Sequence, residues 1–374
     1  MDDGHDVDLG EAARAVVLAH AAAPGAAVAA SLGARTGAGV AGRSTYDATS
    51  PPIGIETPFD LASVTKPFVA VTLARLVRHR AIALSEPLGE VFPRVRGTPA
   101  AEVPIELLLA HRSGLAAHIE LFAPLRVGLP FEREVAIDLA ARSRRAECVG
   151  SIPPDGFAPV YSDMGYLLLG LAMEARAGLA LDELVAREVL RPLGIDKLVG
   201  AARQLATPSM SDFVARVAPT EDVAFRGGVV RGVVHDENAF AMSGLGLSGH
   251  AGLFGDARAV LRFGRAILDA TRADDGWLGP DDLAPLLRVR QGGSLLAGFD
   301  ARTLENPSSG ARLGPRTFGH LGFTGTSLWI DPDAKFVGVL LTNRVHPTRE
   351  HIAIRKARPA AYDAMFDALS STRV

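Results

Sequence analysis

The chain of 374 residues is long enough for a large buried core, or for two lobes around one cleft. Hydrophobic residues make up 48%, charged residues 22%, and the formal net charge is only -3, which excludes electrostatic capture of nucleic acid or an anionic membrane. The single cysteine, Cys148, excludes an intrachain disulfide and is more typical of inert packing than of catalysis. We therefore expect a globular protein that acts on a small molecule.

The N-terminal segment MDDGHD is acidic where a secretory signal would be basic. Glu11 and Arg14 interrupt the apolar run that follows it. No stretch approaches the ~18 uninterrupted apolar residues of a membrane span. These features predict a cytoplasmic protein without a membrane span, and export would require a start site upstream of Met1.

Within the first eighty residues, a helix is predicted over 9–20, followed by strands over 26–32 and 37–42. A loop over 46–58 and a second helix over 68–77 follow. Pro24-Gly25 ends the first helix. The last of these helices places Ser63 at or just before its first turn, where Pro67 is tolerated because a helix start does not need its amide donor.

The middle of the chain is mainly helical by the same criterion, with helices expected over 105–110, 135–141 and 166–177. Near the C-terminus, β-rich runs over 326–330 and 335–341 flank a turn signal at 331–334, which predicts an antiparallel hairpin. A final helix is predicted over 350–369. This order predicts an α+β fold: an antiparallel sheet flanked by N- and C-terminal helices, with an inserted mainly helical lobe. We assign one domain, 1–374, with a sheet lobe from about 1–80 and 255–374 and a helical lobe from about 81–254.

Ser63 and Lys66 form the first candidate catalytic pair, in the tetrapeptide SVTK. Helical spacing of three puts the hydroxyl and the amine on one face, within hydrogen-bond reach. A serine hydroxyl is a weak nucleophile, which a neighbouring amine can activate by accepting its proton. Taken alone, the tetrapeptide is more often a helix start with a solvent-facing lysine, so its interpretation depends on the rest of the chain.

Four segments give that context, in a fixed order: FDLASVTKPF at 59–68, LLLAHRSGL at 107–115, YSDMGYLLLG at 161–170 and FGHLG at 318–322. The first resembles the nucleophile segment of the serine β-lactamase and penicillin-binding protein superfamily. The others resemble its Leu-Leu-x-His-Thr-Ser-Gly-Leu loop, its Tyr-x-Asn motif, and its third motif, Lys-Thr-Gly or His-x-Gly. The class C β-lactamase-like branch, with family VIII-type esterases and D,D-carboxypeptidases, is the most similar. The resemblance implies a β-lactamase/transpeptidase-like fold and a serine hydrolase that forms an acyl-enzyme on Ser63.

Tyr161 and Asp163 correspond to the second motif. Beside Lys66, the acidity of Tyr161 would rise, so that its phenolic oxygen could serve as general base in acylation and as acid toward the leaving group. Asp163 stands where the family has Asn, and an ionised carboxylate only accepts hydrogen bonds. Asp163 would either hold Lys66 protonated or be neutral itself. The sequence leaves open whether Lys66 or Tyr161 takes the proton of Ser63.

His320 stands where many members have Lys, and would offer a hydrogen bond or a pH-dependent charge to the substrate. Leu321 replaces the usual hydroxyl residue, which weakens the case for β-lactam substrates. Gly322 would let substrate approach the backbone. By position in the motif, the amides of Ser63 and Phe323 would form the oxyanion hole.

A further pair of segments, 233–238 and 248–254, resembles a stretch of the D,D-carboxypeptidase relatives. It contains four residue types that ligate metals, at His235, Asp236, Glu237 and His250. Their spacing is not that of a metal site, so we predict no metal and a hydrogen-bonded loop that closes one side of the cleft.

Three other polar residues remain. His111 is predicted to be a structural hydrogen-bonding residue. Arg344 and Arg349 follow the last strand, where they would grip a substrate carboxylate, although solvated side chains are the more common interpretation.

Other classes of protein fit less well. An α/β-hydrolase would need a Gly-x-Ser-x-Gly elbow, which the chain lacks, and a metallohydrolase would need a ligand set. A non-catalytic penicillin-recognition-fold binding protein is the alternative from another class. We expect an esterase or a D-amino-acid peptidase-like hydrolase, acting without a cofactor on a small ester, amide or peptide. The sequence does not indicate the oligomeric state.

Overall fold

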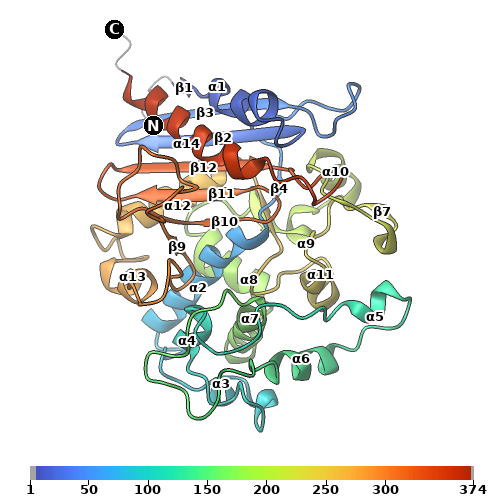
Figure 1. Cartoon of the computed structure of the whole chain (residues 1–374), viewed down its shortest axis with the longest axis vertical. Helices are drawn as coiled ribbons and strands as arrows, with labels where there is room; N and C mark the ends of the chain where they lie inside the picture. Colours follow the sequence, from blue (N-terminus) through green and yellow to red (C-terminus); the bar gives the residue numbers. More distant parts are fainter. Residues whose placement is uncertain (1–5, 372–374) are drawn as a thin grey trace.

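The computed structural model describes residues 6–371, so the acidic segment 1–5 used for the export prediction lies outside the described residues. The largest sheet has seven strands in the spatial order β1-β3-β2-β12-β11-β10-β9 (Figure 1). Their bounds are β1 Val7–Asp8, β2 Gly25–Leu32, β3 Arg35–Gly42, β9 Asp300–Ala301, β10 Phe318–Leu321, β11 Ser327–Asp331 and β12 Phe336–Thr342. The two ends of the chain meet where β2 pairs with β12, so the sheet is built from both, as predicted.

The sheet is antiparallel at every pair but one. β1 runs parallel to β3, which departs from the predicted all-antiparallel sheet. The chain between them passes through a helix and through β2, and parallel neighbours require such a long connection. The predicted hairpin near the C-terminus is confirmed, since β11 and β12 pair antiparallel around the turn at 332–335.

β2 explains why the sheet is covered on both sides. Successive side chains of a strand point to opposite faces. Val28 and Ala30 belong to the apolar cluster under the terminal helices, whereas Ala27 and Ala29 belong to the larger core on the opposite face. Both faces are buried, so the strand is a continuous apolar run instead of an alternating one.

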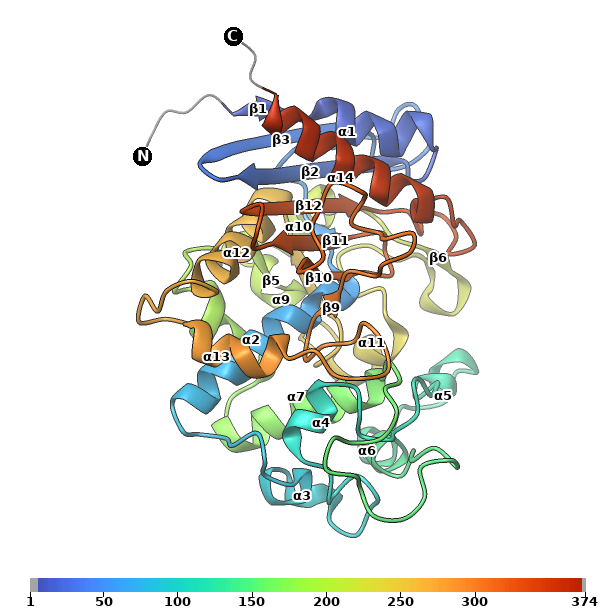
Figure 2. The same ribbon diagram turned by 60° about the vertical axis from the view of Figure 1, so that its left-hand side comes forward.

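Three helices cover this sheet (Figure 2). α1 (Gly10–Arg14), with a π-helical continuation over Ala15–Ala19, and α14 (Ile354–Ser370) lie on one face. α12 (Ala257–Ala270) packs on the other face, against β2, β11 and β12. The predicted first and last helices are thereby confirmed, the last one beginning at Ile354.

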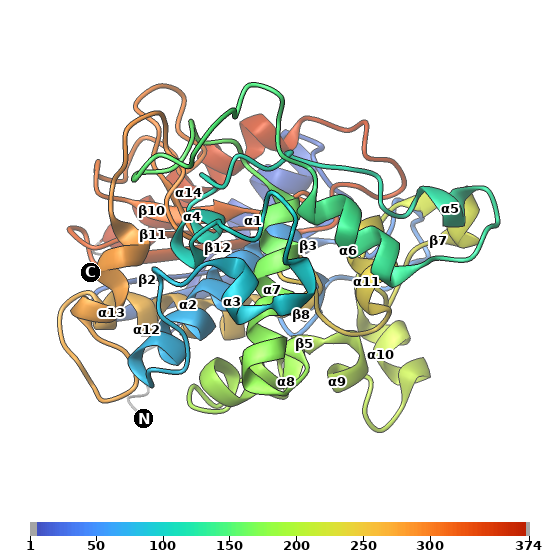
Figure 3. The same ribbon diagram turned by 90° about the horizontal axis from the view of Figure 1, so that it is seen from below.

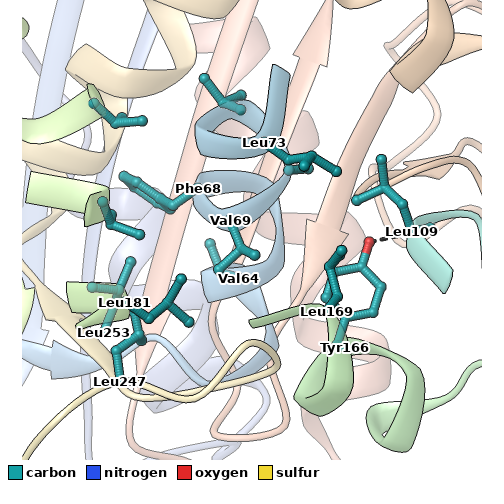
Figure 4. Packing of buried hydrophobic residues seen from close by; sticks show 14 of the residues in the cluster. Val64, Phe68, Val69, Leu73, Leu109, Tyr166, Leu169, Leu181, Leu247 and Leu253 are labelled. Carbon is teal, nitrogen blue, oxygen red and sulfur yellow. Dashed lines mark hydrogen bonds between the residues drawn. The ribbon is translucent and has the colours of Figure 1, made fainter. Parts of the chain in front are cut away.

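The remaining helices lie below or beside the sheet, and Figure 3 shows them from beneath with α7 near the middle. They are α2 Thr65–Arg78, α3 Leu88–Val91, α4 Ile105–Leu109, α5 Ala123–Arg126, α6 Arg133–Ala141, α7 Asp163–Ala177, α8 Leu181–Val185, α9 Ala202–Leu205, α10 Met210–Arg216, α11 Glu237–Ser243 and α13 Pro280–Leu287. α2 carries the main core: Phe68, Val69 and Leu73 pack among leucines from several elements (Figure 4). The Tyr166 hydroxyl of α7 donates to the Leu109 carbonyl at 2.8 Å, which satisfies its buried polar end.

Two short sheets in the middle of the chain were not predicted. β4 (Phe59–Asp60), β8 (Leu253–Gly255) and β5 (Val199–Ala201) form one, and β6 (Asp222–Val223) and β7 (Gly228–Val229) form the other. Strands of two or three residues are too short to show a period, which is why the sequence did not reveal them.

Within residues 6–371, no single helix has the length and apolar composition to cross a membrane. One pair, Asp163–Ala177 with Leu181–Leu190, meets those two criteria only when taken together, and it is bent by 77°.

Candidate active site

Ser63 lies in a constrained turn between β4 and α2. The chain forms a 3-10 turn over Ala62–Val64, and Ala62 has a φ of 47°, a left-handed conformation that is costly for a residue with a Cβ. The Asp60 carboxylate holds this turn, accepting from the backbone N–H of Ala62 at 2.8 Å and of His235 at 2.6 Å. These contacts fix the position of the Ser63 hydroxyl at the start of α2.

Lys66 lies beneath Ser63 with a side chain that is 0% exposed. Its Nζ donates to Ser63 Oγ at 3.0 Å, to Asp163 Oδ1 at 2.8 Å and to the His250 carbonyl at 3.2 Å. Nζ also lies 4.6 Å from the centroid of the Tyr161 ring. Three acceptors match the three N–H bonds of an ammonium, and an aromatic face stabilises a cation. The resting geometry therefore fits a protonated Lys66.

The loop 111–117 positions the Tyr161-x-Asp163 motif. His111 Nδ1 accepts from the Ser162 backbone N–H at 3.0 Å, and its ring centroid lies 4.7 Å from that of Tyr161. The Asp163 N–H donates to the Ala117 carbonyl at 2.9 Å. Burial lowers the pKa of His111 well below its ordinary value, which keeps Nδ1 available as an acceptor. The predicted structural role of His111 agrees with these contacts.

Tyr161 is a neutral phenol in this environment. Burial and the negative charge of Asp163 raise its pKa well above the ordinary value, and a hydrogen bond with Ser63 only partly opposes them. This direction is opposite to the increased acidity expected from Lys66, because Asp163 and burial outweigh that cation. Tyr161 is thus placed to donate a proton, and its phenolate form is strongly disfavoured.

His320 lies on β10 and is only 2% exposed. Its Nδ1 lies 2.8 Å from the Leu321 carbonyl, so Nδ1 carries the proton and Nε2 is an acceptor. Burial and the charge of Lys66 lower the pKa of His320 to about 3. Of the two expected contributions of His320, a hydrogen bond or a pH-dependent charge, this lowered pKa favours the hydrogen bond at neutral pH, and its role toward the substrate stays a prediction.

Gly322 and Phe323 follow β10 beside the Ser63 turn. A Cβ at Gly322 would clash with Thr326 Oγ1 and lie 2.6 Å from the Leu61 carbonyl, so glycine allows this loop to pack directly against the turn that carries Ser63. The Phe323 N–H has no acceptor within residues 6–371. It is therefore a free amide donor of the kind that an oxyanion hole requires.

One cleft of about 570 Å³ brings these groups together. It is lined by six of the predicted site residues, Ser63, Tyr161, Asp163, His320, Gly322 and Phe323, and Lys66 lies behind them. Polar groups converging in one concave site are the usual setting for small-molecule chemistry.

The predicted hydrogen-bonded loop borders this cleft. His250 Nε2 pairs with Asp236 Oδ1 at 2.8 Å, and His235 Nε2 pairs with Glu221 Oε2 at 2.9 Å. The fourth residue, Glu237, pairs with Arg349. These side chains are thus engaged with one another or with protein partners, and across the described residues no three metal-ligating side chains converge.

Arg344 and Arg349 also line the cleft; Arg344 is 8% exposed, and the Arg349 side chain is 36% exposed. Arg344 donates to the carbonyls of Phe323 (2.9 Å), Arg349 (2.9 Å) and His351 (2.8 Å). Arg349 forms an ion pair with Glu221 at 2.6 Å and another with Glu237. The solvated interpretation is wrong for Arg344, whose guanidinium group is held by three backbone carbonyls, whereas Arg349 is held by two carboxylates and still exposes part of its side chain.

Several charged residues of the site have no role in the prediction from the sequence. Asp60 holds the Ser63 turn, Asp300 lines the cleft, and Arg358 of α14 reaches it while donating to the Gly322 carbonyl at 2.8 Å. Asp60 lies within the first motif segment but has no assigned role there, whereas Asp300 and Arg358 belong to no motif and line the cleft from β9 and α14. The one local signal was that Asp60 lies two residues before Ala62, where the 3-10 turn begins. This position is typical of a side chain that caps a turn.

A serine and a buried lysine one turn apart, with a tyrosine facing them between a sheet and a helical lobe, define a serine hydrolase of the β-lactamase and transpeptidase fold. The chain belongs to the Beta-lactamase family, whose model matches residues 13–362.

Two curated relatives extend this comparison. An "N-acetylmuramyl-L-alanine amidase" of Bacillus subtilis is 29% identical over 78% of this chain and 68% of the relative. A "Putative D-alanyl-D-alanine carboxypeptidase" of Salmonella paratyphi A is 28% identical over 78% of this chain and 70% of the relative.

Two solved structures share the fold. EstCE1, described as a hydrolase with promiscuous acyltransferase activity, has a TM-score of 0.70 at 20% identity, covering 95% of this chain and 97% of its own. The D-amino acid amidase of Ochrobactrum anthropi SV3 has a TM-score of 0.69 at 22% identity, covering 98% and 99%.

Proposed function

We propose that Ser63 attacks the carbonyl carbon of a small amide or peptide and forms an acyl-enzyme. The C–N bond breaks, the amine leaves with a proton, and water then releases the acyl group as a carboxylic acid. The observation that carries this proposal is the position of Lys66 Nζ, 3.0 Å from Ser63 Oγ and 2.8 Å from Asp163 Oδ1. The free amide of Phe323 and that of Ser63 would stabilise the oxyanion.

Lys66 and Asp163 form the proposed route for the Ser63 proton. A protonated Lys66 cannot accept a further proton while it keeps all three of its own. It can take the proton of Ser63 if it passes one of its protons to Asp163 in the same step. In a buried site, a neutral amine and carboxylic acid also avoid the cost of two desolvated charges. The proton held by this pair then returns to the leaving nitrogen through Tyr161: its neutral hydroxyl, hydrogen-bonded to Ser63, donates to the nitrogen and is reprotonated by the pair.

A small amide or peptide is the proposed substrate class. Arg355 and Arg358 line one side of the cleft, and because guanidinium groups bind carboxylates well, a peptide with a carboxylate would fit on that side. The names of the two curated relatives, an amidase and a carboxypeptidase, also support an amide or peptide substrate. Leu321 offers no hydroxyl to a β-lactam.

A fluorophosphonate probe tests the nucleophile. We expect mass spectrometry to find the label on Ser63, and no label on the Ser63→Ala variant. Ser85→Ala, at an exposed serine outside the cleft, is the matched control and should label like the wild type. An unlabelled wild-type Ser63 would refute the proposal.

A substrate panel tests the class. We would compare kcat/KM for a D-alanyl-D-alanine peptide, p-nitrophenyl acetate and nitrocefin. Because all three substrates would acylate the same serine, the order of their kcat/KM values reports on how the cleft recognises each substrate and not on the catalytic groups. Nitrocefin turnover above that of both other substrates would contradict an amide or peptide substrate.

A further inference from the structure

Asp300 is a carboxylate of the cleft that lacks a partner within residues 6–371. It begins β9, directly opposite Gly319 and one position from His320 in the register of the sheet. It lines the same cleft as Ser63, yet its Oδ1 is enclosed and accepts no hydrogen bond. Asp300 as a whole is part-buried, and enclosed carboxylate oxygens are normally hydrogen-bonded, so an unpaired carboxylate at a site wall indicates a missing partner.

The other acidic side chains that line the cleft are already paired. Asp163 pairs with Lys66, Asp236 with His250, Glu120 with Arg126 and Glu237 with Arg349. Asp300 therefore differs from its acidic neighbours in the described part of the cleft.

The backbone around Asp300 is held firmly. Gly298 has a φ of 89°, and a Cβ there would clash with Ala70 of α2. Phe299 is 1% exposed and packs edge to face with Phe318 at 5.3 Å. The carboxylate is thus built into the wall of the cleft by the packing of β9 against β10 and α2.

We propose that Asp300 binds a cationic amino group of the substrate, so that the enzyme prefers amides with a free ammonium near the scissile carbonyl. This inference rests on the proposed function. An ammonium would supply charge-assisted hydrogen bonds to the carboxylate and compensate its charge. A fixed negative charge in a cleft also attracts cations and disfavours neutral analogues of the same shape.

The ionisation of Asp300 is consistent with this role. Burial raises its pKa to about 6, against the opposing charge of Lys66. At neutral pH the carboxyl group is therefore mostly ionised.

The experiment measures how well two small amides protect Ser63 from the fluorophosphonate probe. D-Alaninamide carries a free ammonium, and N-acetyl-D-alaninamide does not. In the wild type, we expect D-alaninamide to give half protection at a concentration at least 10-fold lower than N-acetyl-D-alaninamide requires. In Asp300→Asn, this preference should fall at least 10-fold, because the amide side chain keeps the shape but not the charge.

Glu120→Gln is the matched control, since it removes a cleft carboxylate that Arg126 already pairs at 2.8 Å. Its preference ratio should stay within twofold of the wild type. An unchanged ratio in Asp300→Asn, or an equal loss of protection by both amides, would overturn the inference. Failure of the probe to label wild-type Ser63 without any competitor would instead refute the proposed function.

Discussion

Lys66 Nζ lies 2.8 Å from Asp163 Oδ1, and this pair replaces the Lys–Asn contact that the family motif would provide. Lys66 is fully enclosed and Asp163 is 19% exposed, so the pair is shielded from water. A carboxylate here can hold a proton, which an amide cannot. The proton route proposed for Ser63 depends on this difference.

Replacing Asp163 by Asn restores the usual family residue and tests that route. We expect kcat to fall about 100-fold with little change in KM, because positioned acid–base groups contribute about 100- to 10,000-fold. Steady-state kinetics on the best substrate of the panel would measure it, with thermal melting to verify folding. Activity within threefold of the wild type would show that Asp163 serves only as a hydrogen-bond acceptor.

Gly322→Ala should distort the oxyanion side of the site. Its Cβ would clash with Thr326 Oγ1 and lie 2.6 Å from the Leu61 carbonyl, so β10 and the Ser63 turn would have to separate. We expect about 1–3 kcal/mol of lost stability and at least a 100-fold loss of kcat/KM. Urea unfolding and kinetics would report both.

Gly54→Ala is the control for this glycine series. The nearest atom to a Cβ at Gly54 is Thr57 Oγ1 at 3.7 Å, which is an ordinary contact. Its stability should stay within about 0.5 kcal/mol of the wild type. Equal effects at both positions would contradict the packing explanation for Gly322.

The neutral state of His320 predicts a pH dependence of stability. Its folded pKa, about 3, lies below the ordinary unfolded value of about 6.5. Between these values the unfolded chain binds more protons, so the free energy of unfolding should decrease as the pH falls through this window. Burial lowers the pKa of His111 too, and that residue adds to the same trend.

Between pH 6 and 4, His320→Gln should reduce the slope of the free energy of unfolding against pH by about 1.4 kcal/mol per pH unit. Urea unfolding at several pH values measures this slope. A slope that is the same in His320→Gln as in the wild type would contradict a neutral His320.

The ammonium preference assigned to Asp300 should disappear on acidification. Its pKa of about 6 means that the carboxylate is lost below that pH, whereas an α-amino group stays protonated. Lys66, Tyr161 and Tyr166 are the other titratable groups that act on Asp300, and both tyrosines have pKa values raised well above 10.

We therefore expect the protection ratio between the two amides to fall toward one from pH 7.5 to pH 5. The Asp300→Asn variant should show a low protection ratio at both pH values, which distinguishes the titration of Asp300 from any effect of Lys66. A wild-type ratio that does not vary with pH would contradict this assignment.

The amino-acid sequence was sufficient for the parts of the fold that have long periodic patterns. The apolar run of β2, the β11–β12 hairpin and the helices around 68–77 and 166–177 are all where the sequence places them. The sequence did not predict β4 to β8, because strands of two or three residues have no readable period. It also did not predict the parallel β1–β3 pair, because pairing direction depends on distant partners.

For the site, the sequence by itself determined which residues are candidates, since Ser63, Lys66, Tyr161 and His320 fall in four ordered motifs. Only the tertiary structure decided their charge states and their additional neighbours. Burial and Asp163 keep Tyr161 neutral, burial and Lys66 keep His320 neutral, and the packing of β9 brings Asp300 into the cleft. These properties depend on desolvation and on charges brought together from remote segments, neither of which has a local signature in the chain.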